Sequence, residues 1–492
     1  MKGWYHIMLK KGLALTISAV LLAGVLAGCG GKSDVSGPDS SKATTSGFSS
    51  TTDHSGVTGT VKVAVPEWNI TDMQVQIGNF LDAYPNVDVE YETFSSEGAQ
   101  AYLTAQAQTK SLPDILVGDW GSLPFSVSQG WVKPLNEFLD KDEEAKYIPA
   151  SLLKDYTYMD KIYALPMDLQ FQCIAINLDL LDELNLEKPD YDWTIEEYTE
   201  LLKAATSTKT SGTERLWGFD SFMTAALDKN VGYNTYDAEA RKFNFSGSWA
   251  PALKLFSDLR AVPGLEAWTL RNSNVNGDKS DYTKKFGDGD VTDMNMAFKS
   301  GKVLTESFML TSDSSWMRYM NFEWEMYPLP QDETIGCRQN MHANHAFMLE
   351  GAQSPDAAYE LLKWLTTGAE GNVKKMEMYA QKDGEDVTTG YLWYFPSTQH
   401  PDVIKAMEQN EHIQGGIQYM YDHMATAVRA DLYKIVPGYE QVNADYIVPI
   451  INEARDGRRE AAAVAAEMDE KANKQLAKAW LEFEEKLERL NK

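Results

Sequence analysis

Tryptophan stands next to a polar residue at two places where a predicted strand ends. Residues 61–65 form a β-branched, alternating segment that is followed by Pro66-Glu67-Trp68-Asn69, and the strand at residues 115–117 is followed by Gly118-Asp119-Trp120. A flat aromatic ring beside a carboxylate or an amide offers a ligand both an apolar face and hydrogen-bonding groups. The repeated pattern indicates that a ligand binds where these strands end.

Two other groups of residues have the types that bind metal ions. His342-x-x-His345 has no third ligand at a matching spacing, so a zinc site is not expected. Asp288-x-Asp290-x-x-Asp293 would suit calcium, but it lacks the regular calcium-loop pattern and its closing glutamate. A solvated acidic loop is the preferred interpretation, with calcium as the alternative. We predict no metal and no cofactor.

Strands and helices alternate around the two tryptophan segments. Helical spacing at residues 73–84 is followed by a strand at 87–91, a helix at 98–109 and the strand at 115–117. This β-α-β-α-β order predicts a mostly parallel sheet covered by helices. In such sheets ligands bind beyond the carboxyl ends of the strands, which is where Trp68 and Trp120 stand.

Two strand signals follow one another in the middle of the chain. An apolar segment ends at Leu165-Pro166, and residues 171–177 form an alternating run. Gln170 and Gln172 lie at the junction, where we expect the chain to cross from one lobe to another. Thr194 with Glu197 predicts a capped helix start, and residues 461–490 predict an acidic amphipathic helix.

The N-terminus has the form of an export signal. Lys2, Lys10 and Lys11 precede an uncharged apolar run at residues 12–28, and Leu26-Ala27-Gly28-Cys29 resembles the lipobox of bacterial lipoproteins. We therefore expect a signal peptide at 1–28, lipidation of Cys29, and a flexible Gly/Ser/Thr tether over the rest of 29–59. The protein would then stand on the extracellular face of the cytoplasmic membrane, attached through its lipid.

Charge and cysteine content restrict the function further. The chain has 72 acidic and 45 basic residues and a formal net charge of -27, which argues against nucleic-acid binding. Its 492 residues suggest two or three folding units. Cys173 and Cys337 both stand in apolar contexts, so two buried thiols are preferred over a disulfide, which stays open.

Seven segments resemble the extracellular solute-binding proteins of sugar ABC importers, the maltose-binding-protein-like family. In chain order they are 83–89, Leu112-Pro113-Asp114-Ile115, 161–166, 176–181, 193–198, 298–303 and 354–365. The resemblance covers the chain from about residue 61 to its end. Two departures fall where ligand preference would be set: Met341-His342-Ala343-Asn344-His345 replaces a small-residue pair, and residues 225–295 contain extra loop.

The resemblance implies an α/β, two-lobed periplasmic-binding-protein-like fold of type II, with mostly parallel sheets, a hinge and a central ligand cleft. We expect lobe 1 at 60–166 plus 303–365 and lobe 2 at 167–302 plus 366–492. Residues 167–169 would be the hinge that closes the lobes on a ligand. The implied partners are a carbohydrate, expected to be an oligosaccharide, and the membrane subunits of an ABC permease, with the protein itself a monomer.

A sugar site needs flat aromatic rings for C–H faces and polar groups for hydroxyls. Most of the 13 Trp and 24 Tyr must be core or surface residues, so we select those at strand ends and cleft loops. The expected ligand-binding residues are Trp68, Asn69, Asp119, Trp120, Gln170, Gln172, Trp217, Asp220, Ser307, Trp316, Asn344, His345, Trp393 and Tyr394.

Other functions remain as alternatives. The same fold would also suit a peptide, a polyamine or another small solute, or a ligand sensor for a membrane receptor. An extracellular glycosidase is less favoured, because 72 acidic residues make some close carboxylate pair nearly inevitable. The sequence contains no G-x-S-x-G, H-E-x-x-H or phosphate-binding glycine loop, and we predict that the protein is not an enzyme.

Overall fold

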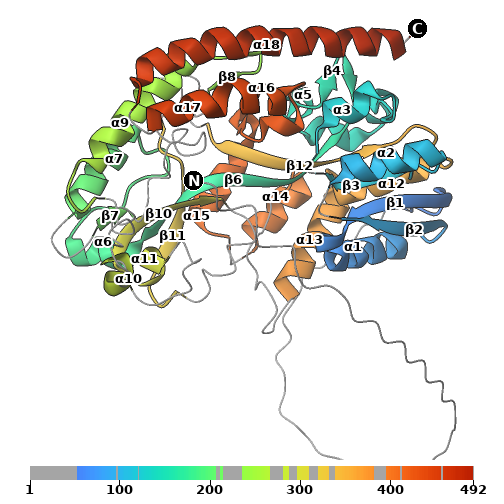
Figure 1. The fold of residues 1–492 in the computed structure, drawn as a ribbon. Coiled ribbons are helices and arrows are strands. Elements are labelled where there is room, and N and C mark those ends of the chain that lie inside the picture. The colour runs from blue at the N-terminus through green and yellow to red at the C-terminus, as the bar shows by residue number, and fades with distance from the viewer. Residues whose placement is uncertain are drawn as a thin grey trace, which may run out of the picture. The chain divides into compact units, whose positions relative to one another are not determined.

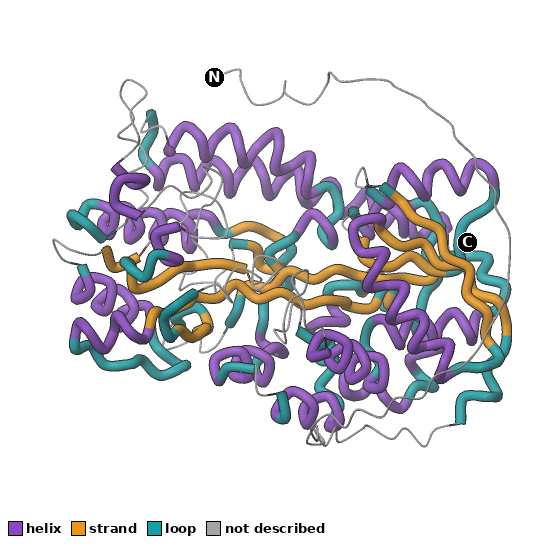
Figure 2. The backbone as a smooth tube through the Cα atoms, turned by 90° about the horizontal axis from the view of Figure 1, so that it is seen from below, coloured by secondary structure: helices purple, strands orange, loops and turns teal. Residues whose placement is uncertain are grey.

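The computed structural model describes residues 53–95, 98–119, 121–206, 211–213, 235–265, 281–286, 296–309, 320–331, 338–381, 395–410, 413–455, 458–490 and 492. They belong to one compact unit, Phe48–Lys492. Strands run through the middle of this unit, and helices cover both sides of them (Figures 1 and 2). None of the described helices combines the length and the apolar composition needed to cross a bilayer.

The main sheet has nine strands. Its order is β2 (Val87–Phe94), β1 (Gly59–Pro66), β3 (Ile115–Asp119), β12 (Asn340–Met348), β6 (Leu165–Asn177), β10 (Val303–Met309) and β7 (Ser211–Thr213), while β11 (Trp324–Pro328) pairs with β6 and β13 (Val428–Arg429) pairs with β12. β1 runs parallel to both β2 and β3, as the β-α-β-α-β pattern predicted. β12 is antiparallel to β3 and to β6, and it joins the two halves of the sheet.

Helices of the expected lengths follow the strands. They are α1 (Ile70–Ala83), α2 (Ala99–Thr109), α3 (Leu123–Ser128), α4 (Asn136–Leu139), α5 (Ala150–Lys154), α6 (Leu178–Leu184), α7 (Ile195–Ala205), α9 (Ala250–Arg260), α10 (Asp281–Phe286), α11 (Met296–Lys299), α12 (Pro355–Leu365), α13 (Ala369–Gln381), α14 (Pro401–Glu408), α15 (Gly415–Asp422), α16 (Tyr439–Val442), α17 (Val448–Arg455) and α18 (Ala461–Leu490). The described strands also form two hairpins, β4 (Thr157–Tyr158) with β5 (Lys161–Ile162) and β8 (Tyr236–Asp237) with β9 (Lys242–Phe243), and short 3-10 and π helices lie between the longer elements.

Buried side chains form three clusters around the sheet. One cluster lies under α1 and α12, where Phe80 and Leu361 pack on β1. A second lies under α13–α15, where Met420 packs with Phe171 of β6. The third contains residues of α3, β6, β12 and α18, so it extends across both halves of the sheet. The hydrophobic effect therefore stabilises the two halves together as well as each by itself.

Local signals fixed several helix ends. The Thr194 hydroxyl accepts a hydrogen bond from the Glu197 N–H at 3.1 Å, and the Glu197 carboxylate accepts one from the Thr194 N–H at 2.7 Å. This capping box confirms the predicted start of α7. The predicted C-terminal helix is also confirmed, since α18 spans Ala461–Leu490.

The prediction of two separate strands around residue 168 was wrong, because β6 is one strand of 13 residues. Its polar residues do not break the strand. Instead, Asp168 adopts a left-handed φ of 52° and forms a bulge, and the pairing with β12 shifts between Ala343 and Asn344. The buried Asp168 carboxylate forms an ion pair with Lys375 of α13, so its charge is compensated inside the protein.

Two observations bear on the expected boundaries of the lobes and of the tether, which stay predictions. Residues 303–365 were assigned as a block to lobe 1, and β10 within this range pairs with the second half of β6, from Gln172 to Ile176. The flexible tether was expected to reach residue 59. However, the His54 ring stacks on Tyr84 at 4.1 Å and lies 3.3 Å from the Glu370 carboxylate, so residues 53–58 contact the body.

Candidate ligand-binding site

Three buried charged residues, Arg429, Asp431 and Lys434, bond to the backbone in the middle of β12. Between its pairing with β13, which ends at Met341, and its pairing with β3, which starts at His345, this edge of β12 has no neighbouring strand among the described residues. Side chains supply the missing hydrogen bonds. The Ala343 carbonyl accepts from Arg429 Nη2 at 3.2 Å and from Lys434 Nζ at 3.1 Å, and its N–H donates to Asp431 Oδ2 at 3.2 Å. The backbone groups of β12 are therefore satisfied although no strand lies beside them.

The same three side chains pair with one another. Asp431 Oδ1 accepts from Arg429 Nε at 2.7 Å, and Lys434 Nζ lies 3.1 Å from Asp431 Oδ2. Burial alone would raise the pKa of Asp431, but Arg429 and Lys434 outweigh it and hold that pKa well below its usual value. Asp431 is therefore charged throughout the physiological pH range.

Two groups beside this cluster respond differently to burial. Burial raises the pKa of Asp155 to about 7, although Arg429, with Nη1 at 3.7 Å from Asp155 Oδ2, opposes the shift. Burial lowers the pKa of His342 to about 4, so its ring is neutral at pH 7. The cluster thus places Asp431, which stays charged, near Asp155, whose carboxyl titrates near neutral pH.

Asn344 is held by this cluster at one end only. Its Oδ1 accepts a hydrogen bond from Lys434 Nζ at 3.0 Å, while the residue is 3% exposed. Within the described residues its Nδ2 has no hydrogen-bond partner. A buried amide donor without a partner is uncommon in folded proteins and marks a place where a polar group from outside would be stabilised.

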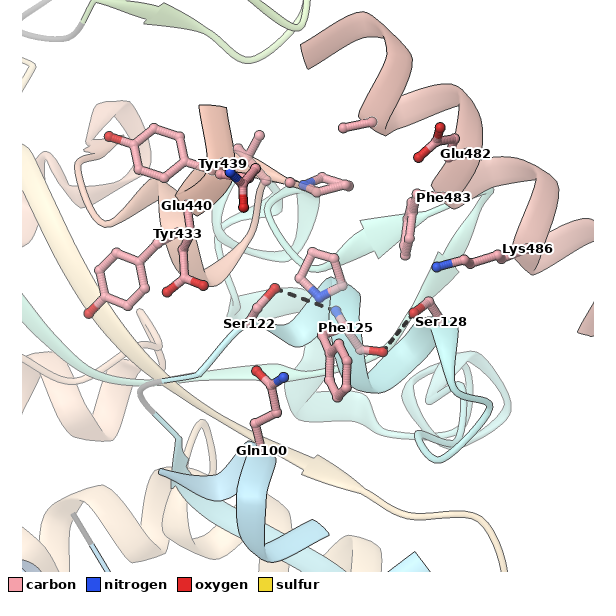
Figure 3. Close-up of a pocket in the computed structure, with 16 residues that line it drawn as sticks. Gln100, Ser122, Phe125, Ser128, Tyr433, Tyr439, Glu440, Glu482, Phe483 and Lys486 are labelled. Carbon is pink, nitrogen blue, oxygen red and sulfur yellow. Dashed lines mark hydrogen bonds between the residues drawn. The ribbon is translucent and has the colours of Figure 1, made fainter. Parts of the chain in front are cut away.

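A cavity of about 330 Å³ is lined by residues of α2, α3, α16 and α18 (Figure 3). Ser122, which follows Asp119 by one short turn, lines it together with Phe125 of α3 and Gln100 of α2. The short helix η7 (Leu432–Lys434) contributes Tyr433. The remaining walls are Pro124, Ser128, Val436, Pro437, Gly438, Tyr439, Glu440, Gln441, Ala479, Glu482, Phe483 and Lys486. The cavity begins at Ser122, three residues after the end of β3, and none of the predicted ligand-binding residues that the structure describes is among its lining residues.

The cavity has the composition of a small-molecule site. Its volume lies in the usual range for such sites, and it mixes aromatic rings with amide, hydroxyl and charged groups. Ser122 caps α3, since its Oγ accepts from the Phe125 N–H at 3.4 Å, and Ser128 Oγ donates to the Phe125 carbonyl at 2.8 Å (Figure 3). These bonds fix the backbone of the wall that Phe125 forms.

The sheet brings several predicted residues together. Asp119 pairs with His345 between β3 and β12, Gln170 pairs with His342, and Gln172 pairs with Met309 of β10. Gln172 is buried, and its Oε1 accepts from Asn340 Nδ2 at 3.2 Å. His345 is fully buried, with Tyr156 and Phe347 at ring distances of 5.7 and 5.9 Å.

Trp68 and Asn69 lie at the same edge of the sheet as Asp119. They end the short helix η1 (Glu67–Asn69) directly after β1, and the Trp68 side chain is 47% exposed. The ends of β1 and β3 are close because Gly118, at φ +68°, leaves room for Pro66: a Cβ there would lie 3.2 Å from the proline ring. Ser307 lies in β10 opposite Ile174.

The other predicted residues, Trp120, Trp217, Asp220, Trp316, Trp393 and Tyr394, lie outside the described residues, as do the 288–293 acidic loop and Cys337. Cys173 is buried in β6. The described residues contain no group of three or more His, Cys, Asp or Glu that could hold a metal ion. Contact between a ligand and any predicted residue stays a prediction.

The sequence reasoning missed the cavity residues from the C-terminal third. Tyr433, Tyr439 and Glu440 were not among the predicted residues, which were chosen at strand ends and cleft loops. Residues 427–438 are a short strand, a 3-10 turn and bends. Pro437-Gly438 is the one local signal that indicates such a segment.

A two-lobed α/β body with a polar-aromatic cavity defines a class of small-molecule binding proteins. Residues 67–371 match the family model described as bacterial extracellular solute-binding protein. The chain belongs to this family, and the resemblance to its maltose-binding-protein-like members is confirmed.

Solved structures share the fold. The sugar-binding protein MalE from Xanthomonas citri matches with a TM-score of 0.64 and 13% identity, over 87% of this chain and 99% of that one. The cyclic α-maltosyl-1,6-maltose binding protein from Arthrobacter globiformis matches with 0.62 and 16%, over 86% and 100%. The GacH receptor of Streptomyces glaucescens, solved also with acarbose, matches with 0.58 and 18%, over 86% and 99%. These matches confirm the predicted two-lobed fold.

Proposed function

We propose that the protein is the lipid-anchored substrate-binding subunit of an ABC importer, and that it captures an oligosaccharide and delivers it to a membrane permease. The observation that carries this proposal is the cavity lined by α2, α3, α16 and α18, with Tyr433 and Tyr439 beside amide, hydroxyl and charged groups. Sugars present apolar C–H faces and a ring of hydroxyls, and this mixture of side chains complements both.

Capture in this proposal works by closure of the two halves of the fold. The cavity has walls from α2 and α3, early in the chain, and from α16 and α18 at its end. A ligand that contacts both walls binds the closed form better than the open form, and this difference in affinity shifts the population toward closure. The bulge at Asp168, where β6 leaves regular pairing, is the proposed hinge.

Attachment and delivery rest on the N-terminal sequence and on the family. Cys29, within Leu26-Ala27-Gly28-Cys29, would carry the lipid on the extracellular face of the membrane, and the residues up to about 52 would be the tether. Solved structures with the same fold include a protein in complex with cycloalternan, a cyclic α-maltosyl-1,6-maltose binding protein and a receptor in complex with acarbose. An oligosaccharide is therefore the cargo we propose for this chain.

A thermal-shift screen tests the proposal. Maltotriose, cellotriose, xylotriose, cycloalternan and acarbose would be tested with glucose, a tripeptide and spermidine. A ligand at one hundred times its Kd should stabilise the folded state by about 2.7 kcal/mol, so the melting temperature should rise with concentration for at least one saccharide. No rise with any saccharide would overturn the proposal, and a rise with spermidine or the peptide alone would assign another cargo.

The same saccharides distinguish binding from catalysis. After overnight incubation with the protein, chromatography should recover each of them intact. A shortened product that forms in proportion to protein concentration would identify an enzyme instead.

A further inference from the structure

The C-terminal helix α18 has 30 residues and runs across a large part of the fold (Figure 1). Its first half is fixed to the segment that joins β9 to the helix η3 (Phe245–Trp249). Asp469 accepts from the N–H groups of Phe245 and Ser246 at 2.6 and 2.9 Å. Asn473 exchanges two hydrogen bonds with the Phe243 backbone, at 2.6 and 2.9 Å. These four bonds set the rotation of the helix about its axis.

The second half of α18 is fixed to other parts of the fold. The Arg241 guanidinium lies over the Trp480 ring at 4.0 Å and forms an ion pair with Glu484 at 2.6 Å. The Phe483 ring meets Tyr158 edge-on at 5.0 Å. The last turn packs near the residue after α3, since a Cβ on Gly130 would lie 3.1 Å from Leu490 Cδ2. The helix therefore joins the β8–β9 hairpin to α3.

A glycine allows α18 to approach the start of α16 closely. Gly438 has a left-handed φ of +70°, and a Cβ there would lie only 2.6 Å from Cβ of Ala479. The turn before Tyr439 and Glu440 thus packs directly on α18. As a result, α16 and α18 form one continuous wall of the cavity.

Successive turns of α18 face the cavity. Ala479, Glu482, Phe483 and Lys486 follow one another at helical spacing and line the same space (Figure 3). Phe483 is buried in the core, whereas Glu482 and Lys486 are exposed. The close-up shows these two side chains on the α18 side, with Glu440 across from them and Gln100 below. Glu482 forms an exposed ion pair with Lys478 at 3.5 Å, which is weak enough for a ligand that enters this space to compete with it.

We infer that α18 is part of the ligand site and that Glu482 and Lys486 bind the hydroxyls of an uncharged oligosaccharide. This inference rests on the proposed function. A carboxylate accepts and an ammonium donates, so together they suit the vicinal hydroxyls of a sugar ring.

The charge of the cavity selects against acidic sugars. Glu440 and Glu482 are acidic, Lys486 is basic, and the other lining residues are uncharged, in a chain with a net charge of -27. A uronic acid would meet more negative than positive charge there, and like charges placed together cost binding energy.

The test compares two cavity variants with two controls on the same helix, in the full-length protein. Glu482→Gln and Lys486→Met change the cavity, whereas Glu488→Gln and Lys474→Met change exposed α18 residues that do not line it. Calorimetry would measure Kd for maltotriose, cellotriose and xylotriose, and for trigalacturonate as their acidic counterpart. Each cavity variant should bind the neutral trisaccharide with a Kd about ten times higher than that of wild type, as loss of one charge-assisted hydrogen bond predicts. The Kd of each control variant should change by less than twofold.

The outcomes separate the two proposals. Wild-type protein that binds a neutral trisaccharide while all four variants bind it equally well would overturn the role of α18 and leave the proposed function intact. Tighter binding of trigalacturonate than of every neutral trimer would overturn the selection for uncharged sugar. Wild-type protein that binds none of these trimers, and that no saccharide of the thermal-shift panel stabilises, would overturn the proposed function, and this inference with it. Because the four positions are exposed, circular dichroism should show the same fold for every variant.

Discussion

At the scale of single residues, the centre of β12 depends on charges that lie 86 to 91 positions away along the chain. Arg429 and Lys434 bond to the Ala343 carbonyl across these sequence separations. Neither residue stands in a motif, so nothing in the sequence marks them as part of the site. Asn344, by contrast, was expected at the site from its place in the sequence, and Lys434 holds its Oδ1.

Asp431→Asn should destabilise the protein by about 3–5 kcal/mol, because it leaves Arg429 and Lys434 buried without their shared carboxylate. Urea unfolding at pH 7 measures this loss. Asp258→Asn is the control, since Asp258 pairs with Lys254 on the surface and should cost less than 1 kcal/mol. Equal losses in both variants would contradict a structural role for the buried cluster.

Asp155→Asn should change how stability depends on pH. The folded pKa of about 7 lies above the ordinary value near 4, so between these limits the folded state binds more protons than the unfolded state. Wild-type stability from this group therefore falls as pH rises from 4 to 7. The variant should match wild type at pH 4 and be more stable at pH 8, by about 4 kcal/mol.

Unfolding free energies of both proteins at pH 4, 5, 6, 7 and 8 check this expectation. Asp160→Asn, at an exposed turn of the β4–β5 hairpin, is the matched control for the loss of a carboxylate. A difference between Asp155→Asn and wild type that stays constant from pH 4 to pH 8 would count against the raised pKa.

At the scale of elements, the sequence predicted whether a segment is a helix or a strand better than it predicted where a strand begins and ends. Helix α7 was marked by its capping box and α18 by its apolar spacing, because both signals are local. The strand β6 was divided because Asp168, Gln170 and Gln172 suggested a polar break. Tertiary contacts allow the strand to continue through these polar residues. Lys375 pairs with Asp168 and Asn340 with Gln172, and both partners come from distant parts of the chain.

The left-handed backbone of Asp168 predicts an unusual order of stability. Asp168→Gly and Asp168→Ala both lose the ion pair with Lys375, but only glycine adopts φ near +52° without steric cost. The glycine variant should be about 1 kcal/mol more stable than the alanine variant. Chemical denaturation gives this difference. At Glu90, an exposed residue of β2 without such a backbone, alanine should instead be the more stable of the two.

At the scale of the whole molecule, the order of short segments along the chain was enough to predict the family and the two-lobed fold. The cavity was not predictable in the same way. Its walls come from Gln100, Ser122, Tyr433 and Lys486, which meet only after the C-terminal helices pack on α3. Local periodicity contains no information about such a meeting, so the predicted residues were limited to strand ends.

Closure of the two lobes predicts a change in size. Small-angle scattering of the protein should show a smaller radius of gyration with a stabilising saccharide than without it, because closure brings the walls of the cavity together. A sugar that causes no thermal shift serves as the control and should leave the radius unchanged. If the radius stays constant at saturation with a bound saccharide, capture by hinge closure is excluded.

The position of β12 between β3 and β6 also determines when the protein can fold. β3 and β6 belong to the first 177 residues, but the strand that separates them begins only at Asn340. A growing or exported chain therefore exposes two unpaired strand edges until that segment arrives, and such edges promote association with other chains. Arrival of β12 is thus the step that protects the chain from aggregation, and a chain that stops before it should require a chaperone.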